Sequence, residues 1–260
     1  MVVKNQKSAL EELTQFANND VHSIIIDGPE GCGKTYLSKQ YGKMLNVSDF
    51  ISVQPKVSDI RQAVDACTAI KSPMVLCIEN LDLGVASASY TLLKFLEEPI
   101  PTAYVIVTCR NIINIPDTIV SRCSVTTVST PVVSDILAYA EQINPSKYLA
   151  MKKNKLWNCA RTFKDANTIL NLTNEQQEYF KSLASMTSFS SPISSMMWNL
   201  GHYPDKSETP VDLVLRYIVY ISKSEHIKQA AMECLSNLST MKIAPHAIIA
   251  KFLFESKYTE

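Results

Sequence analysis

Short apolar runs alternate with helix-like periods over the first half of the chain. Runs of the kind found in buried strands lie at residues 24–26, 50–53, 74–78, 104–107 and 125–128. Apolar positions three or four residues apart predict helices over residues 5–18, 34–45, 58–70 and 86–97. Ser58 is the expected N-cap of the third helix. Strands that alternate with helices in this way predict a parallel sheet built from βαβ units.

After Pro131 the pattern becomes helical throughout. The predicted helices cover residues 132–144, 146–153, 156–170, 174–186, 193–200, 210–222, 225–239 and 244–255. A stretch rich in Ser and Thr at residues 185–195 indicates a boundary between two helical regions. We therefore expect an α/β domain at residues 1–131, a small helical domain at 132–185 and a C-terminal helical domain at 186–260.

Composition and charge narrow the class of protein. The chain carries 25 Lys and Arg against 25 Asp and Glu, whereas a stand-alone DNA-binding protein normally has a basic excess. Any contact with nucleic acid must therefore be local or shared among several subunits. No run approaches the roughly 18 apolar residues that cross a bilayer, and the first residues do not resemble a signal peptide, so we expect a cytoplasmic protein with no membrane contact. Seven cysteines and four histidines are scattered singly, which argues against a disulfide framework and a zinc site.

The strongest chemical motif is a glycine-rich loop between the first strand and the next helix. It has the spacing G-x-x-x-x-G-K-[ST], and three of the six glycines of the chain fall within it. Such a loop points backbone N–H groups at phosphate oxygens, while its lysine bridges the β- and γ-phosphates and its hydroxyl binds Mg²⁺. The predicted site for ATP comprises Gly28, Pro29, Glu30, Gly31, Cys32, Gly33, Lys34, Thr35 and Tyr36.

A phosphate loop needs a metal-side group at the end of a neighbouring strand. The run at residues 74–78 delivers Glu79 and Asn80 to that point, where the usual pair is Asp followed by Glu. Glu79 can serve Mg²⁺ together with Thr35, whereas the amide of Asn80 can orient a water molecule but cannot accept its proton. Asp82 is the alternative carboxylate. The sequence therefore predicts nucleotide binding and leaves the hydrolytic step open.

Two further motifs carry a family resemblance. The chain reads Thr-Leu-Leu-Lys-Phe-Leu-Glu-Glu-Pro at residues 91–99 and Val-Ser-Arg-Cys at residues 120–123. Together with the P-loop, these motifs resemble, in order and spacing, the AAA+ subunits of DNA clamp loaders. That family includes the gamma and delta-prime subunits of bacterial DNA polymerase III and the small subunits of replication factor C. The resemblance is close over residues 20–131 and weak over 132–172.

The resemblance implies a fold, a site and a set of partners. The fold would be a P-loop AAA+ α/β domain followed by a helical lid domain and a collar-like helical domain. Arg122 would be an arginine finger that reaches the γ-phosphate of the adjacent subunit. The sensor-1 position matches Arg110, with Thr108 or Asn111 as alternatives, and the sensor-2 position matches Lys164. The implied partners are other loader subunits in a homo- or hetero-oligomeric ring or spiral, expected as a pentamer, a sliding clamp and primer–template DNA.

The family pattern also suggests DNA contacts, which the residues alone do not distinguish from ordinary surface roles. Ser58 and Arg61 match the helix that tracks DNA phosphates, although a helix cap and a solvated charge explain them equally well. Lys94 is open to the same two readings, and the cluster at Lys152, Lys153 and Lys155 is read as a solvated face. The chain lacks the four-cysteine zinc module and the Tyr-Arg-Pro opening of the bacterial subunits. These departures suggest a compact version such as a bacteriophage protein, active in the host cytoplasm.

Two functional hypotheses follow, and a third is weaker. In the first, the chain is an ATPase subunit that uses ATP binding and hydrolysis to open a sliding clamp and load it on DNA during replication. In the second, it is a structural subunit similar to delta-prime, which hydrolyses little and donates Arg122 to a neighbour. Asn80, Arg110 and Lys164 favour the second hypothesis, and the intact Gly33-Lys34-Thr35 favours the first. The third is another AAA+ remodeller, such as a helicase loader.

Overall fold

A computed structural model of the chain shows two compact units, Met1–Ala138 and Tyr139–Glu260. The residues that it describes are 6–47, 49–70, 72–153, 155–174, 176–177, 180, 211–240, 247–248 and 250–252. Within these ranges, no helix is both long enough and apolar enough to cross a membrane. Each unit is described by itself.

The first unit is built on a five-stranded sheet in the order β2-β3-β4-β1-β5. The strands are β1 (Ser23–Asp27), β2 (Asp49–Val53), β3 (Met74–Ile78), β4 (Ala103–Cys109) and β5 (Ser124–Thr127). Every neighbouring pair is parallel, as the alternation of strands and helices predicts. The carboxyl ends of all five strands therefore meet at one edge of the sheet.

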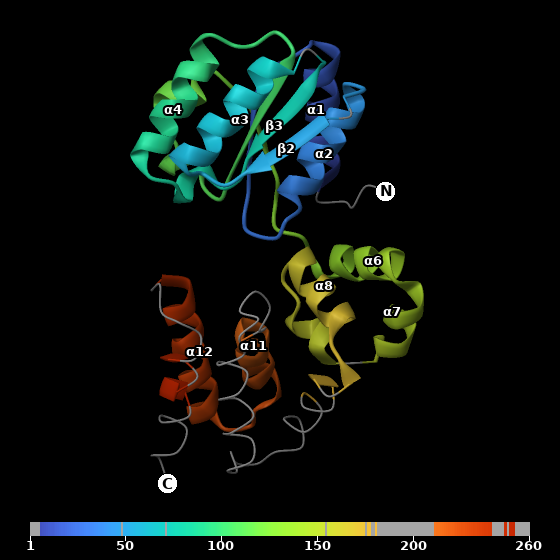
Figure 1. Cartoon of the computed structure of the whole chain (residues 1–260). Helices are drawn as coiled ribbons and strands as arrows, with labels where there is room; N and C mark the ends of the chain where they lie inside the picture. The colour runs from blue at the N-terminus through green and yellow to red at the C-terminus, as the bar shows by residue number, and fades with distance from the viewer. Residues whose placement is uncertain are drawn as a thin grey trace. The chain divides into compact units, whose positions relative to one another are not determined.

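Helices cover both faces of this sheet (Figure 1). The helices of the unit are α1 (Lys7–Asn18), α2 (Lys34–Met44), α3 (Val57–Ala69), α4 (Ala86–Glu97) and the short α5 (Asp117–Val120). Short 3₁₀ turns, η2 (Leu81–Leu83) and η3 (Ile112–Asn114), follow β3 and β4. Side chains alternate along each strand, so β1 places Ile25 on the face of α3 and α4 and Ile24 on the face of α1 and α2.

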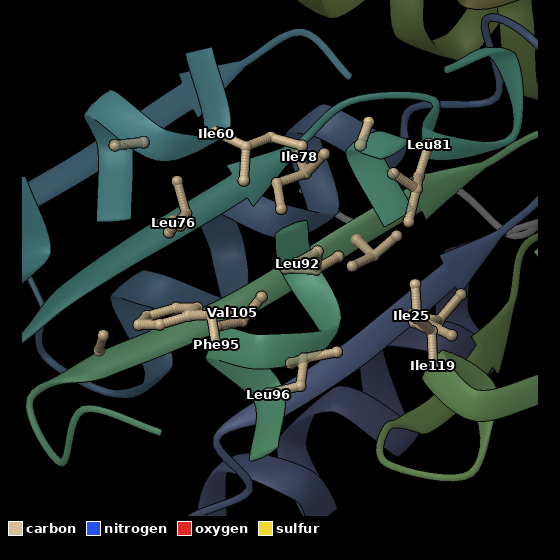
Figure 2. Close-up of a cluster of buried hydrophobic side chains, with 14 of the residues drawn as sticks. Ile25, Ile60, Leu76, Ile78, Leu81, Leu92, Phe95, Leu96, Val105 and Ile119 are labelled. Atoms are coloured by element: carbon tan, nitrogen blue, oxygen red, sulfur yellow. The ribbon is translucent and has the colours of Figure 1, made fainter. Parts of the chain in front are cut away.

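The face under α3 and α4 holds the larger core cluster (Figure 2). Ile60 of α3 and Leu92 of α4 are fully buried against Leu76 and Ile78 of β3. Fully burying one such aliphatic side chain contributes about 1.5–3 kcal/mol. The helix that bears the 91–99 motif is therefore fixed on the sheet by its apolar side. Its polar C-terminal end lies outside the core and can contact other groups.

Two local predictions are wrong in detail. Ser58 is not the N-cap of α3, because the helix begins at Val57 and the N-cap is Lys56, which makes no side-chain cap. Val57 packs against the core, which draws it into the first turn, and the Ser58 hydroxyl donates to Asp59 instead. The helix expected over residues 156–170 is divided into η4 (Lys155–Cys159) and α8 (Phe163–Asn171).

The break before α8 has a local cause in the sequence. Thr162 is the N-cap of α8 and accepts a hydrogen bond from the Asp165 amide, while the Asp165 carboxylate accepts one from the Thr162 amide. This capping box satisfies donors that would otherwise be orphaned at a helix start, so a new helix begins here. The other described helices of this region are α6 (Val133–Ile143), α7 (Pro145–Met151), α11 (Val211–Ile221) and α12 (Glu225–Thr240).

The predicted helix at 193–200 lies outside the described residues. Those at 174–186 and 244–255 lie mostly outside them. The boundary between the two compact units falls within α6, between Ala138 and Tyr139. The division of the helical part into a lid domain and a collar-like domain stays a prediction.

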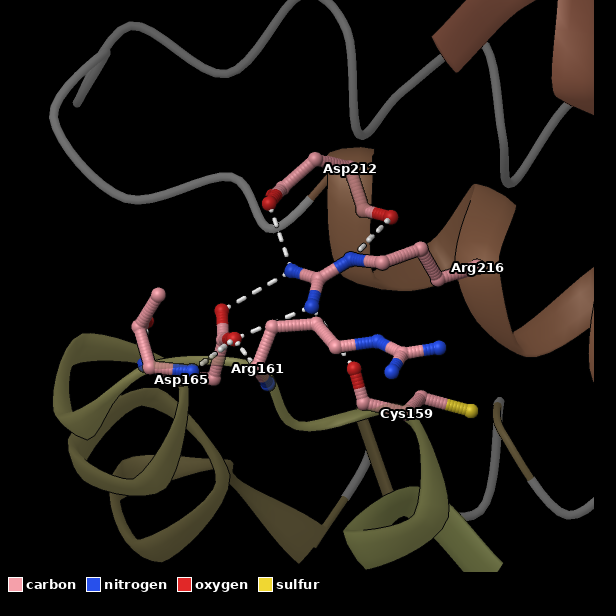
Figure 3. Close-up of polar contacts among 6 residues, drawn as sticks. Cys159, Arg161, Asp165, Asp212 and Arg216 are labelled. Carbon is pink, nitrogen blue, oxygen red and sulfur yellow. Dashed lines mark hydrogen bonds and ion pairs between the residues drawn. The ribbon is translucent and has the colours of Figure 1, made fainter. Parts of the chain in front are cut away.

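One buried ionic cluster joins α8 and α11 inside the second unit (Figure 3). The Arg216 guanidinium donates to both carboxylate oxygens of Asp165, at 2.9 Å each, and to the Cys159 carbonyl at 2.6 Å. Asp212, one turn earlier on α11, accepts a further bond from Arg216 at 2.6 Å. Arg216 and Asp165 expose only 18% and 10% of their side chains, so the negative charge of Asp165 is balanced by Arg216, while the backbone amides of Arg161 and Thr162 supply further hydrogen bonds.

We expect Arg216→Ala to destabilise the second unit by about 3–5 kcal/mol, because it leaves the buried Asp165 carboxylate uncompensated. The measurement is urea unfolding followed by circular dichroism and by tryptophan fluorescence. Lys228→Ala is the matched control, since Lys228 pairs with the exposed Glu225 and should contribute less than about 1 kcal/mol. Equal losses in the two variants would contradict this account.

The same pair predicts a dependence of stability on pH. Burial raises the pKa of the Asp165 carboxyl, but the hydrogen bonds and charge of Arg216 lower it by more, so the net pKa lies below its usual value. The stabilisation is thus fully present above about pH 4, the pKa of an unfolded Asp, and is lost as the pH falls through the lower folded value. The difference in unfolding free energy between the wild type and Asp165→Asn should shrink below about pH 4. Urea titrations between pH 3 and pH 7 would show a constant difference if this assignment were wrong.

Candidate nucleotide-binding site

The glycine-rich loop lies at the carboxyl edge of the sheet, between β1 and α2. Its first residue is tied to the neighbouring strand, since the Gly28 amide donates to the Cys109 carbonyl at 3.2 Å. Gly31 and Gly33 have φ values of 73° and 98°, in the left-handed region that glycine adopts without steric cost. Helix α2 begins at Lys34, so the loop leads directly into a helix N-terminus.

Gly28 is required by space rather than by its backbone angles. A Cβ atom at this position would lie 2.6 Å from the Val128 carbonyl oxygen and 3.1 Å from the Cys32 sulfur. Val128 is held in place because its amide donates to the Asp27 carbonyl at 2.8 Å. The first turn of the loop therefore passes directly over the end of β5.

The loop lysine is held close to the loop backbone. Lys34 is 7% exposed, and its ammonium donates to the carbonyl oxygens of Gly28 at 2.6 Å and Pro29 at 2.9 Å. Behind the loop, the side-chain Nε2 of Gln6 donates to the Cys32 carbonyl at 3.0 Å, a contact that the sequence gives no signal for. Burial raises the pKa of the Cys32 thiol, so this side chain acts as a small apolar group under the loop.

The predicted metal-side residues come together. The Thr35 hydroxyl lies 3.5 Å from Glu79 Oε1, and the same carboxylate accepts hydrogen bonds from Ser52 Oγ at 2.8 Å and Gln54 Nε2 at 3.3 Å. Hydroxyl and carboxylate oxygens are the ligands that Mg²⁺ prefers, usually one or two of them together with phosphates and water. This donor set fits Mg²⁺. Among the described residues no group of three or more His, Cys, Asp and Glu could hold a metal ion without a nucleotide.

Asn80 takes a conformation that few residue types adopt. Its φ and ψ are 49° and 54°, and Asn is one of the side chains enriched in this left-handed region. The backbone amide of Asn80 donates to Thr108 Oγ1 at 2.9 Å, which ties the end of β3 to β4. Thr108 is 2% exposed and is the most buried of the three sensor-1 candidates. It lies beside Asn80.

Arg110 connects the loop to the turn after β4. Its guanidinium lies 2.8 Å from the Glu30 carboxylate, and its amide donates to Asp82 Oδ2 at 3.1 Å. Asp82 Oδ1 is buried without a hydrogen-bond partner in the described part of the chain. Asn111 caps η3 by accepting a bond from the Ile113 amide. Arg110 is therefore engaged with the phosphate loop itself, and Asp82 holds the backbone of this turn.

Arg122 lies at the opposite edge of the sheet. It precedes β5, whose first residue Ser124 pairs with Ile24 near the start of β1, whereas the phosphate loop follows the end of β1. The strand length between the two edges is about 10 Å at about 3.3 Å per residue. The guanidinium donates to the Thr118 carbonyl at 2.7 Å and to Glu97 Oε1 at 3.0 Å. Arg122 therefore does not face the phosphate loop of its own chain.

The remaining predicted residues are dispersed. Tyr36 is in the first turn of α2 and is 39% exposed. Lys164 is the second residue of α8 in the second unit, and its role at the nucleotide stays a prediction. Ser58 and Arg61 lie on α3, Lys94 lies on α4, and the lysines near residue 152 follow α7. Their DNA contacts also stay predictions.

The sheet order, the flanking helices and the loop with its helix define the P-loop AAA+ fold. Residues 48–131 match the family described as "DNA polymerase III, delta subunit". The solved structure of a DNA polymerase III gamma subunit-related protein from Thermotoga maritima is similar, with a TM-score of 0.58 and 14% sequence identity. That similarity covers 95% of this chain and 98% of the other. The comparison with curated proteins found no significant match.

The two matches confirm the resemblance to clamp-loader AAA+ subunits. The family match covers the part of the chain that contains Glu79, the 91–99 motif and Arg122, and it ends where the helical region begins. The structural match extends over the helical region and, at this low identity, supports the fold alone.

We expect Gly28→Ala to destabilise the first unit by about 1–3 kcal/mol, because the added Cβ forces the loop away from the Val128 carbonyl. Urea unfolding of the full chain measures the loss. Nucleotide affinity should fall as well, since the loop backbone must shift. Ala69→Ser, at the exposed last residue of α3, is a control of similar size that should change neither quantity. A Gly28→Ala protein with wild-type stability would contradict the packing described above.

Proposed function

We propose that this protein is an ATP-binding subunit of a DNA sliding-clamp loader. In this proposal, ATP binding and hydrolysis drive the opening of a clamp and its loading on primer–template DNA during replication. The single observation that carries the proposal is the separation of Lys34 and Arg122 to opposite edges of one sheet. One chain then supplies the phosphate loop, and a neighbour supplies the arginine.

The phosphate side of the site supports ATP and Mg²⁺ as ligands. Lys34 lies against the loop carbonyls, where it can bridge the β- and γ-phosphates, and Thr35 and Glu79 present oxygens to a metal ion. When bound, Mg²⁺ would neutralise charge on the phosphates. The residues of the chain bind and orient the nucleotide, while the helix N-terminus of α2 adds a favourable dipole.

The arginine side supports coupling between subunits. Arg122 is 37% exposed and is oriented by Glu97 of α4, so it is presented at the surface in a defined direction. A cation placed beside the phosphates of a neighbouring subunit stabilises the charge that develops in phosphoryl transfer. Nucleotide binding would then favour the closed arrangement of the assembly, because only that arrangement completes the site.

The hydrolytic step relies on orientation of water rather than on a carboxylate at position 80. Asn80 can hold a water molecule, and Thr108 fixes its backbone. The proposed partners are further loader subunits in a ring or spiral, a sliding clamp and primer–template DNA in the cytoplasm. A weakly hydrolysing structural subunit, similar to delta-prime, is the alternative that the experiment distinguishes.

The first test is nucleotide affinity of the isolated full chain, measured with a fluorescent ATP analogue. Lys34→Ala should weaken binding by about 30- to 1,000-fold, because about 2–4 kcal/mol of charge-assisted contacts is lost. Arg122→Ala should bind the analogue as tightly as the wild type does, because in this proposal Arg122 acts at the site of a neighbouring subunit. Lys39→Ala, an exposed lysine of α2, is the matched control. Equal loss in the Lys34 and Arg122 variants would overturn the division of the site between two chains.

The second part of the test is ATP hydrolysis with a sliding clamp and primed DNA. Each single variant should lose stimulated hydrolysis, and an equal mixture of the two should recover part of it where copies are adjacent. The recovery arises because a Lys34→Ala chain still offers Arg122 to the intact loop of its neighbour. Wild-type nucleotide binding without hydrolysis under any condition would favour the structural-subunit alternative. Lack of nucleotide binding by the wild type would overturn the proposal.

A further inference from the structure

The end of β2 supplies two polar side chains that converge on one carboxylate. Ser52 Oγ donates to Glu79 Oε1 at 2.8 Å, and Gln54 Nε2 donates to Glu79 Oε2 at 3.3 Å. Both oxygens of Glu79 are therefore fixed from one side. The contact depends on the parallel pairing of β2 with β3, in which Ser52 lies beside Cys77 and Val53 beside Ile78.

The backbone also holds this arrangement. The Glu79 amide donates to the Val53 carbonyl at 2.9 Å, which continues the ladder of the two strands by one residue. The carboxylate oxygen held by Ser52 is also the one that lies 3.5 Å from the Thr35 hydroxyl. The side chain of Glu79 is thus directed from β2 toward the first turn of α2.

A glutamate at this position needs such support. Ordering its long side chain costs up to about 1.5–2 kcal/mol of rotamer entropy, so an unsupported glutamate would present its oxygens poorly to a metal ion. Hydrogen bonds from neighbouring groups fix metal-binding carboxylates in other proteins, and their removal typically weakens metal binding by about 10–100-fold. Ser52 and Gln54 are neutral donors, so they can orient the carboxylate without cancelling its charge.

We propose that Ser52 and Gln54 are positioning residues for the Mg²⁺ of the bound nucleotide, acting through Glu79. This inference rests on the proposed ATP-binding function and adds a second strand to the site. This role requires no contact between either residue and the nucleotide. Their loss should therefore change the dependence of binding on Mg²⁺ and leave metal-free nucleotide binding unchanged.

The experiment measures the affinity of the full chain for a fluorescent ATP analogue across a Mg²⁺ titration and in EDTA. Ser52→Ala should raise the Mg²⁺ concentration for half-maximal enhancement by about 10-fold, and Gln54→Ala should raise it by a smaller factor. Affinity in EDTA should equal that of the wild type in both variants. Ser52→Thr keeps the hydroxyl and suits a strand, so it should restore the wild-type titration.

Ser72→Ala is the matched control. Ser72 also donates to a carboxylate across β2 and β3, but its partner Asp49 lies at the amino ends of the strands, away from the loop. This variant should titrate as the wild type does. A thermal unfolding midpoint for each variant separates a local effect from a loss of folding, and Gln54→Ala carries the test if Ser52→Ala unfolds.

The outcomes distinguish this inference from the proposed function. A wild type that binds no nucleotide overturns both. A wild type that binds nucleotide without any Mg²⁺ dependence overturns the positioning role alone. The same holds if Ser52→Ala and Gln54→Ala titrate like Ser72→Ala, or if they lose affinity equally with Mg²⁺ and in EDTA.

Discussion

The contact between Gly28 and the Val128 carbonyl constrains the whole candidate nucleotide site. The parallel sheet brings β1 between β4 and β5, so the chain leaving β1 is held by the Cys109 carbonyl on one side and crowded by Val128 on the other. Only a residue without a side chain passes through this gap, and the loop must then rise over the end of the sheet and re-enter as α2. That path places Lys34 and Thr35 beside the ends of β3 and β4. The close approach of backbones, more than any single polar contact, determines the position of the candidate phosphate loop.

Polar contacts at the same edge then link neighbouring strands to one another. Ser52 and Gln54 at the end of β2 hold Glu79, and Thr108 of β4 accepts a hydrogen bond from the Asn80 amide. Because these contacts run across the strand order, a shift at one strand end is transmitted to its neighbours. At Asn80, backbone conformation and chemistry favour different residues. The left-handed backbone suits an asparagine better than the glutamate that is usual at this position. A residue that departs from the family pattern for chemistry is therefore well matched to the local conformation.

Much of the fold could be predicted from the sequence, because buried parallel strands are short apolar runs and each predicted run overlaps an observed strand. The glycine spacing likewise predicted that Lys34 and Thr35 lie where the loop enters α2. The end of the run at 74–78 predicted that Glu79 lies near Thr35. The break at Thr162 was missed although its capping box is visible in the sequence, because apolar periodicity continues across it. Ser52 and Arg110 could not be assigned to their partners. Their contacts depend on which strands are neighbours, and no local pattern records the order β2-β3-β4-β1-β5.

The two motifs that carry the family resemblance are one physical unit. Glu97 ends α4, and its carboxylate binds the guanidinium of Arg122, which also donates to the Thr118 carbonyl of α5. The apolar side of α4 is fixed on the sheet through Leu92 and Phe95, so Glu97 has a defined position relative to the strands. The position of the Arg122 guanidinium therefore depends on the orientation of the whole sheet. The phosphate loop lies at the other edge of the same sheet, so in the proposed assembly a neighbour that contacts one edge would also constrain the other. In the proposed assembly, a subunit built in this way would transmit the occupancy of its own site to the next subunit through the sheet, with no need for an internal hinge.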